Sequence, residues 1–250
     1  MQAANDPDIC IIIPTYNNGR TIMQVLRKVL SFTKQVIVVD DGSTDDTRKL
    51  LQEARLPITL IQYENNRGKG HALKTGFLKA LEQGFTYAVT IDSDGQHFPE
   101  DIPLFIEAIR KHPNALIVGS RNLESKNMPG GNTFANKFSN FWFYIQTGQP
   151  LADTQSGFRI YPLKLLTGLK AITNRYEAEL ELLVLSAWHG VELYSIPVRV
   201  YYPPEEERVS HFRPVIDFLR ISLLNTVLCV GAILYGLPLR IFRSCRRSQV

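Results

Sequence analysis

Residues 89–97 read Val-Thr-Ile-Asp-Ser-Asp-Gly-Gln-His, an apolar strand that leads directly into two aspartates. Carboxylates one residue apart, here Asp92 and Asp94, suit a hard divalent cation such as Mg²⁺ or Mn²⁺. Such a cation takes its other oxygen ligands from water and from the diphosphate of a substrate. The alternative is an ordinary turn in which the aspartates accept backbone N–H groups, and an isolated pair of this spacing is more often such a turn.

Two further apolar strands upstream also end in polar residues. Residues 9–13 lead into Pro14-Thr15-Tyr16-Asn17, and residues 36–39 lead into Asp40-Asp41-Gly42-Ser43. In an open parallel sheet, ligands bind outside the carboxyl ends of the strands. We therefore expect three polar strand ends at one edge of a sheet, a convergence that a single turn does not explain.

The chain alternates between strands and helices as far as residue 120. The expected strands are 9–13, 35–39, 58–63, 86–91 and 115–119, and the expected helices are 19–32, 44–55, 68–83 and 100–111. This alternation predicts an α/β fold with a mainly parallel central sheet flanked by helices. Beyond residue 120 the pattern changes to a helix at 132–148, a short strand at 157–161, a helix at 176–190 and a long strand at 191–202.

Composition is that of an ordinary folded protein. The 250 residues are 44% hydrophobic and 21% charged, so we expect one domain with a sizeable core, or one domain plus a short appendage. The three cysteines, Cys10, Cys229 and Cys245, form neither a metal-ligand spacing nor a disulfide framework, which favours a reducing compartment. The first residues contain no basic segment followed by an apolar run, so we expect no signal peptide and a cytosolic catalytic domain.

The three polar strand ends together resemble a known signature. Pro14-Thr15-Tyr16-Asn17, Val39-Asp40-Asp41-Gly42-Ser43 and Asp92-Ser93-Asp94-Gly95-Gln96-His97 are similar to the motifs of family 2 nucleotide-sugar glycosyltransferases, which have the GT-A fold. Within that family the chain most resembles the dolichol-phosphate mannose synthase branch, which glycosylates polyprenyl phosphates. The resemblance covers roughly residues 8–213, and it implies a GT-A domain over residues 1–213.

The resemblance also implies a donor site and a metal site. The expected donor-binding residues are Pro14, Thr15, Tyr16, Asn17, Asp40, Asp41, Lys69 and Asp92, and the expected ligands of Mg²⁺ or Mn²⁺ are Asp92, Asp94 and Gln96. Asp94 counts as catalytic because the metal neutralises the departing diphosphate. Lys69 lies in a glycine-punctuated helix start, Asn65–Ala72, whose free N–H groups suit an anion. A capped helix start with a solvated Arg67 and Lys69 remains the alternative there.

On the acceptor side, Asp153-Thr154-Gln155-Ser156-Gly157-Phe158-Arg159 resembles the family segment Asp-x-x-x-Gly-Phe-Arg, and Arg121 matches an arginine after the fifth strand. Guanidinium forks match phosphate oxygens, so Arg121 and Arg159 are expected to clamp an acceptor phosphate. The alternative is two surface arginines paired with Asp153 and its neighbours. The family also places a carboxylate near the acceptor, and we expect Glu179 rather than Glu177 to supply it. It would act as a base only toward a hydroxyl acceptor.

A charged loop follows the last expected strand. Glu207-Arg208-Val209-Ser210-His211-Phe212-Arg213 resembles the Arg-x-x-x-Ser-Lys loop of this branch, although the spacing departs by a residue or two. The resemblance gives Arg208 a catalytic role and lets His211 reach the acceptor phosphate. A loop that closes over the bound donor would exclude water and limit hydrolysis.

The C-terminal segment, residues 214–250, indicates a membrane. Nineteen uncharged residues separate Arg220 from Arg240, which is the first of four arginines that end the chain without an acidic residue. As a helix the uncharged run spans ~28 Å, close to the thickness of a bilayer core. Basic groups at both ends weaken a full span, so an interfacial helix or a partial insertion fits equally well. A helix packed on the domain or in an oligomer interface is the remaining alternative.

These observations predict an inverting glycosyltransferase at the cytoplasmic face of a membrane. Its donor is a GDP- or UDP-linked sugar, its acceptor is lipid-linked, above all a polyprenyl phosphate, and no nucleic-acid partner is expected. No cysteine, serine or histidine stands in a nucleophile arrangement, so a direct displacement is expected. The alternatives are transfer to a hydroxyl of a lipid or glycan, and a non-catalytic nucleotide-sugar-binding subunit.

Overall fold

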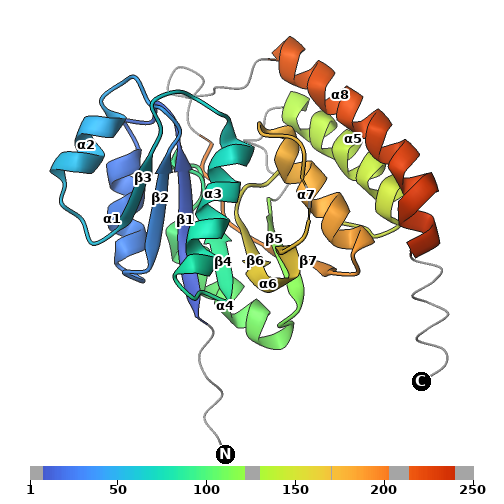
Figure 1. Cartoon of the computed structure of the whole chain (residues 1–250), viewed down its shortest axis with the longest axis horizontal. Helices are drawn as coiled ribbons and strands as arrows, with labels where there is room; N and C mark the ends of the chain where they lie inside the picture. Colours follow the sequence, from blue (N-terminus) through green and yellow to red (C-terminus); the bar gives the residue numbers. More distant parts are fainter. Residues whose placement is uncertain (1–7, 122–129, 170, 203–213, 240–250) are drawn as a thin grey trace, which may run out of the picture.

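A seven-stranded sheet runs through the centre of the protein in the order β3-β2-β1-β4-β6-β5-β7 (Figure 1). The structure is a computed structural model, and it describes residues 8–121, 130–169, 171–202 and 214–239. The strands are β1 Ile9–Thr15, β2 Val36–Asp40, β3 Thr59–Gln62, β4 Tyr87–Thr90, β5 Ala115–Ser120, β6 Arg159–Pro162 and β7 Glu192–Pro197. Neighbouring strands pair in parallel except at β6, which is antiparallel to both β4 and β5.

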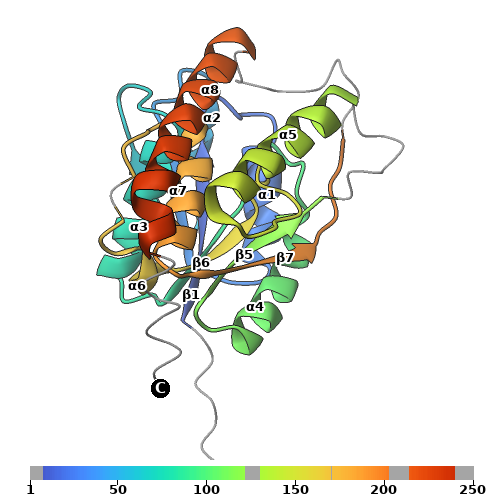
Figure 2. The ribbon, with the colours of Figure 1, turned by 90° about the vertical axis from the view of Figure 1, so that its right-hand side faces the viewer.

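Helices cover both faces of this sheet. They are α1 Ile22–Leu30, α2 Thr47–Glu53, α3 Lys69–Glu82, α4 Ile102–Lys111 after the 3₁₀ turn η1 Pro99–Asp101, α5 Gly130–Thr147, α6 Leu163–Leu166, α7 Glu177–Trp188 and α8 Pro214–Gly231. Side chains of α1, α2 and α4 pack into one hydrophobic cluster with the sheet, and those of α3 and α7 pack into the other. Figure 2 shows α8 and α5 lying outside α7, at the surface.

The two-sided cover explains the unbroken apolar strands. Successive residues of a strand point to opposite faces, so a strand buried on both sides needs apolar residues at every position. In β1, Cys10 and Ile12 enter the cluster of α3 and α7, whereas Ile11 and Ile13 enter the cluster of α1 and α4. The predicted mainly parallel sheet flanked by helices is confirmed.

The last strand is shorter than predicted. We expected a strand over residues 191–202, but β7 ends at Pro197. Beyond it the chain leaves β5 and runs along the segment after β4, where Arg199 N–H donates to Asp101 and Tyr201 N–H donates to the carbonyl of Gln96. The apolar residues that suggested a longer strand therefore continue beyond Pro197, where the backbone pairing of β7 with β5 ends.

The C-terminal apolar stretch forms α8, which continues as a π-helical turn, η3 Ala232–Gly236. Its inner face packs on the ring of Trp188. A side chain at Gly231 or Gly236 would bring a Cβ within 2.8 or 2.6 Å of that ring. Among the described residues, one helix, Leu219–Leu239, has the length and apolar character to cross a membrane, and 28% of it is buried.

Candidate active site

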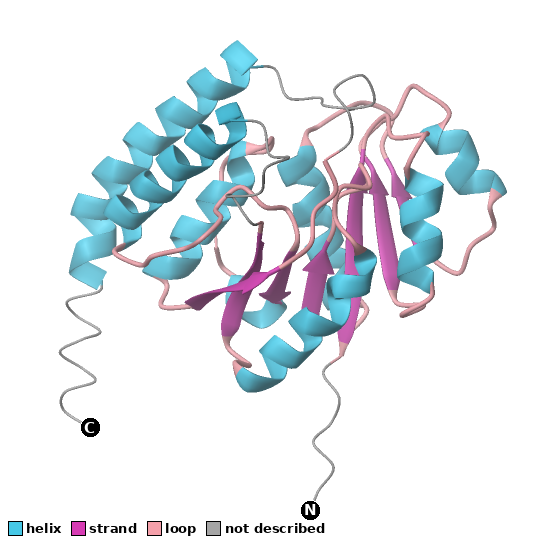
Figure 3. Ribbon diagram, turned by 180° about the vertical axis from the view of Figure 1, so that it is seen from behind, coloured by secondary structure: helices cyan, strands magenta, loops and turns pink. Residues whose placement is uncertain are grey.

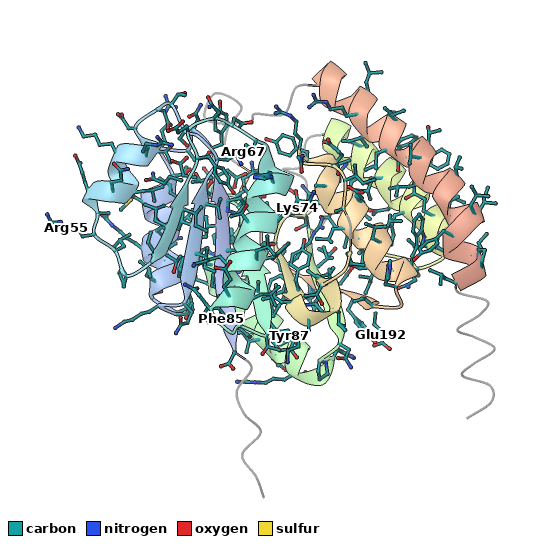
Figure 4. All side chains as sticks on the ribbon, in the orientation of Figure 1. Arg55, Arg67, Lys74, Phe85, Tyr87 and Glu192 are labelled. Atoms are coloured by element: carbon teal, nitrogen blue, oxygen red, sulfur yellow. The ribbon has the colours of Figure 1, made fainter. Side chains whose placement is uncertain are left out.

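Polar residues gather where β1, β2, β4 and β5 end. These parallel strands point to the same edge of the sheet, seen from behind in Figure 3. Arg67 lies at this edge, whereas Phe85 and Tyr87 lie at the opposite one (Figure 4). The parallel register sets Thr15 beside Asp40, so the two turns that follow these strands begin at the same level.

The turns after β1 and β2 are tied together by hydrogen bonds. Asn17 adopts a left-handed backbone, φ 52°, a region that asparagine tolerates better than most residues. Its N–H donates to Ser43 Oγ at 2.9 Å, and its Oδ1 accepts the N–H of Thr44 at 2.8 Å. Asn18 Nδ2 donates to Ser93 Oγ at 2.9 Å, so the residue between the two aspartates is held by the turn after β1. The turn after β1 is thus bonded to both of its neighbours.

Asp40 and Asp41 hold the framework of the predicted donor site. Asp40 is fully buried and accepts the N–H of Ser43 and the side-chain amide of Gln62. Asp41 accepts the N–H groups of Arg67 and Gly68 at 2.8 and 2.7 Å, which fixes the start of α3. Burial raises the pKa of Asp41, while these two N–H groups partly offset the rise.

Lys69 joins the aspartate pair to α7. Its Nζ lies 2.8 Å from Asp92 Oδ1 and 2.8 Å from Glu179 Oε2. Burial alone would lower the pKa of Lys69, but the two carboxylates raise it, so the amine is charged. Burial alone would likewise raise the pKa of Asp92, but Lys69 lowers it. Gly157 leaves room for this cluster, since a Cβ there would lie 2.5 Å from Asp92 Oδ2.

Asp94 carries negative charge that the protein does not fully compensate. Its Oδ1 accepts the N–H of Gln96 at 2.9 Å. Burial and the neighbouring charge of Asp92 raise the pKa of Asp94 to about 6. A cation would relieve this crowding, so the two carboxylates fit a divalent metal in charge and in ligand type. Within the described residues, no group of three or more His, Cys, Asp or Glu side chains is arranged to hold a metal ion unaided. Gln96, water and a diphosphate would have to complete the coordination.

The structure corrects the expectation for Arg159. Its side chain is fully buried, and its guanidinium donates to the carbonyls of Ser156, Thr154 and Glu179 at 2.6, 3.0 and 2.9 Å. A guanidinium closed in by backbone carbonyls presents no fork to a phosphate. The prediction that Arg159 clamps the acceptor phosphate is therefore wrong. Instead Arg159 holds the 153–157 segment against the first turn of α7.

Arg121 lies at the edge as expected, but its fork is engaged. Its Nε and Nη2 donate to the two carboxylate oxygens of Asp153 at 2.6 and 3.0 Å. Burial alone would raise the pKa of Asp153, but Arg121 lowers it, so both groups remain charged. This pairing fixes the orientation of the Arg121 guanidinium at the acceptor end of the edge.

Two polar side chains at this edge were not singled out from the sequence. His97 is buried against Phe158, its Nδ1 has no partner among the described residues, and burial lowers its pKa to about 4. The hydroxyl of Tyr202 is buried without a described partner, and Tyr202 and Arg121 influence each other electrostatically. The position of His97 directly after Gln96 was the available signal. No feature of the sequence around Tyr202 indicated a place in the site.

The remaining predicted residues are placed as follows. Glu179, not Glu177, is ion-paired to Lys69, whereas Glu181 accepts the N–H groups of Ile172 and Thr173. Thr15 Oγ1 is buried without a partner in the described part of the chain. Arg208 and His211 lie outside the described residues.

The family model of glycosyl transferase family 2 matches residues 10–166, more than half of the chain. The protein therefore belongs to glycosyl transferase family 2, as the sequence motifs indicated, and it is a glycosyltransferase.

Two relatives are similar over most of their length. A UDP-N-acetylglucosamine–dolichyl-phosphate N-acetylglucosaminyltransferase of Methanococcus voltae is 32% identical over 79% of this chain and 87% of the relative. A polyprenol monophosphomannose synthase of Mycolicibacterium smegmatis is 28% identical over 75% of each chain.

A solved structure shares the fold. Glucosyl-3-phosphoglycerate synthase of Mycobacterium tuberculosis, in complex with Mn²⁺, UDP-glucose and phosphoglyceric acid, superposes with a TM-score of 0.64 at 19% identity. The match covers 90% of this chain and 79% of that one. The predicted GT-A fold is confirmed.

Proposed function

We propose that this protein transfers a sugar from a nucleoside-diphosphate donor to a polyprenyl or dolichyl phosphate. The observation that carries the proposal is the order of polar groups along the sheet edge. The aspartates at the end of β2 and the turn after β1 lie at one end, the Asp92–Asp94 pair lies in the middle, and Arg121 follows β5 at the other end. This order suits a nucleotide, a diphosphate and an acceptor phosphate taken in turn. Relatives named for transfer to dolichyl phosphate and polyprenol support the acceptor class.

In this proposal the turn after β1 and the aspartates Asp40 and Asp41 shape the nucleotide end. Asp92, Asp94 and Gln96 would hold the Mg²⁺ or Mn²⁺, which neutralises negative charge on the leaving diphosphate. Lys69 adds positive charge beside Asp92 and fixes Glu179. The acceptor is positioned by the positive charge of Arg121, which its pairing with Asp153 fixes at this end of the edge.

The displacement needs no general base with this acceptor. A phosphate monoester is already anionic at neutral pH, so its oxygen can attack the anomeric carbon directly. The new bond forms on the face opposite the departing diphosphate, and the configuration inverts. Glu179 would act as a base only toward a hydroxyl. In the native arrangement Glu179 is ion-paired with Lys69, which favours a positioning role.

The proposal extends to the membrane. Residues 1–213 would form the catalytic domain, and residues 214–250 would hold it at the cytoplasmic face, where the donor is made. The exposed apolar character of α8 supports this division.

The test is a donor screen against a polyprenyl phosphate. UDP-N-acetylglucosamine, UDP-glucose, GDP-mannose and their epimers are offered with Mn²⁺, with Mg²⁺ and with EDTA, and the glycolipid is detected by mass spectrometry. We expect one donor to react in a metal-dependent way, and Asp94→Asn to lower turnover at least ~10²-fold, as loss of a charge-stabilising group does. Transfer only to a hydroxyl acceptor would replace the proposed acceptor, and donor binding without any transfer would indicate a non-catalytic subunit.

A further inference from the structure

Helices α5 and α8 lie side by side at one edge of the molecule (Figures 1 and 3), and each exposes an apolar stripe. On α5, Phe141, Tyr144 and Ile145 are each more than half exposed. Their spacing of three to four residues places them on one side of the helix. The sequence did not indicate this helix as a surface element, because its aromatic residues suit a core equally well.

The stripe on α8 continues into the π-helical turn η3. Leu223, Val227 and Leu234 are 67%, 58% and 74% exposed, and they recur at intervals of four and seven residues. The opposite side is apolar too, but it is packed: Leu224, Leu228 and Ala232 are buried in the core cluster of α3 and α7. A helix that is apolar on all sides normally has both sides covered, so the outer side of α8 lacks a covering layer.

The inner sides of both helices are fixed to the protein by polar contacts. Asn225 of α8 accepts a hydrogen bond from Gln146 of α5 at 2.9 Å, inside the protein. On α5, Asn136 donates to Asp153 at 2.5 Å, and Ser139 is bonded to Thr154 at 2.7 Å. A helix that crosses a bilayer alone would have to give up the Gln146 and Trp188 contacts, so the packed α8 is suited to lie along a surface instead.

The charge around the stripes favours an anionic bilayer. Lys137 is exposed on α5, next to the aromatic stripe. The sequence after Asp217 contains no acidic residue, and four arginines follow α8 between residues 240 and 247. Basic residues beside inserted apolar side chains bind anionic lipid. A second copy of the chain, paired on α5 about a two-fold axis, would instead bring the two Lys137 side chains toward each other.

We propose that α5 and α8 together form one bilayer-facing surface, with α8 lying in the plane of the membrane instead of crossing it. Helix α5, which exposes Phe141, also binds Asp153 through Asn136, and Asp153 in turn pairs with Arg121. Resting on the proposed function, this arrangement presents the acceptor-phosphate end of the site to the headgroup layer. The lipid chain of the acceptor then stays in the bilayer while its phosphate reaches Arg121.

The first experiment measures flotation of the full-length protein with vesicles. Binding should be strong to phosphatidylcholine vesicles containing phosphatidylglycerol and weak to pure phosphatidylcholine. Phe141→Ser combined with Ile145→Ser should lower binding at least ~10-fold with an unchanged melting temperature, since each of these side chains would otherwise be buried in lipid. The matched control replaces two exposed apolar residues elsewhere, Leu78→Ser and Ile172→Ser, which are 63% and 83% exposed in the native protein. Equal vesicle binding by both double variants would show that α5 is not part of the bilayer-facing surface.

The second experiment measures depth. Single cysteines introduced by Ile145→Cys, Leu223→Cys, Leu234→Cys and Leu78→Cys carry a fluorophore, in a background with Cys229→Ser and Cys245→Ser. Quenchers at defined depths in the bilayer should find the first three at one shallow depth and the fourth in water. A steady increase in depth from Leu223→Cys to Leu234→Cys, with Ile145→Cys in water, would establish a spanning helix and overturn the proposal. A dimer in solution that does not bind vesicles would assign the surface to a second copy.

A separate readout keeps the two proposals apart. Sugar transfer to a short-chain, water-soluble polyprenyl phosphate does not require the bilayer, so Phe141→Ser with Ile145→Ser should leave it unchanged and reduce only transfer to long-chain lipid in vesicles. Vesicle binding without any sugar transfer would contradict the proposed function and leave the surface intact. Transfer to both acceptors without vesicle binding would contradict the bilayer-facing surface and leave the proposed function intact.

Discussion

Replacing Lys69 by methionine removes the ammonium group that lies 2.8 Å from both Asp92 and Glu179. The side chains of Lys69, Asp92 and Glu179 are 17%, 24% and 9% exposed, so water can replace the lost contacts only in part. Breaking a buried ion pair on one side typically costs about 3–5 kcal/mol, because a charge is left buried and unpaired. For a chain of this size, 3 kcal/mol corresponds to a melting temperature lower by about 6–12 °C.

Thermal unfolding followed by circular dichroism measures this effect, and the same helix provides the control. Lys79 lies on α3 as well, but its pair with Glu82 at 3.1 Å is exposed, so Lys79→Met should cost less than ~1 kcal/mol. Adding Glu179→Gln to Lys69→Met should recover part of the loss, because it removes one of the two unpaired charges. If Lys69→Met melts within a degree of Lys79→Met, the buried bridge does not exist in solution.

The other predictions concern the acceptor edge and the core. Arg121→Lys should raise the KM for the acceptor while calorimetry finds donor affinity little changed, since lysine keeps the charge but cannot keep the bidentate pairing with Asp153 that orients it. Equal losses of acceptor affinity and donor affinity would indicate that Arg121 binds the diphosphate of the donor instead. Arg159→Lys should lower stability by at least ~2 kcal/mol, because the buried carbonyls that it satisfies lose their donors. An unchanged melting temperature would contradict the buried structural role of Arg159 and favour phosphate binding instead. Gly157→Ala forces a Cβ to within 2.5 Å of Asp92 and should slow transfer about 10²-fold by displacing that carboxylate. Wild-type turnover would show that Asp92 tolerates the shift. Burial raises the pKa of Cys10 to about 12, so iodoacetamide at pH 8 should alkylate it only after unfolding, and mass spectrometry of the native protein would detect any earlier reaction.

The edge where the motifs converge could be predicted because it depends on local patterns. Apolar strands covered on both faces are visible as unbroken runs, and the residue after each run must lie at the carboxyl edge of a parallel sheet. Asp40 at the end of β2 and Asp92 after β4 were found in this way. The position of β6 could not be predicted, because a four-residue strand carries no information about which neighbours it joins.

Contacts between distant segments account for the rest of the site. The sequence placed Lys69 and Glu179 in separate motifs, and only the packing of α3 against α7 brings their charges together. Arg159 was misassigned for a related reason. An arginine after Gly157-Phe158 looks the same in the sequence whether it faces a ligand or lies in the core, and burial decided the outcome here. The exposed apolar side of α5 could not be predicted for the same reason, since the sequence does not show whether its aromatic residues lie in the core or at the surface.

The reversed strand β6 has a consequence for how the chain folds. It sits between β4 and β5, so these two strands do not touch each other, and β5 can join the sheet only after Arg159–Pro162 has been inserted. Until then the first four strands form a half-sheet whose β4 edge offers unpaired backbone groups, the kind of edge that invites aggregation. Residues 91–158 must be synthesised before that edge can be closed. We therefore expect a nascent chain released before residue 159 to depend on chaperones, and insertion of β6 to be the slow, non-local step of folding.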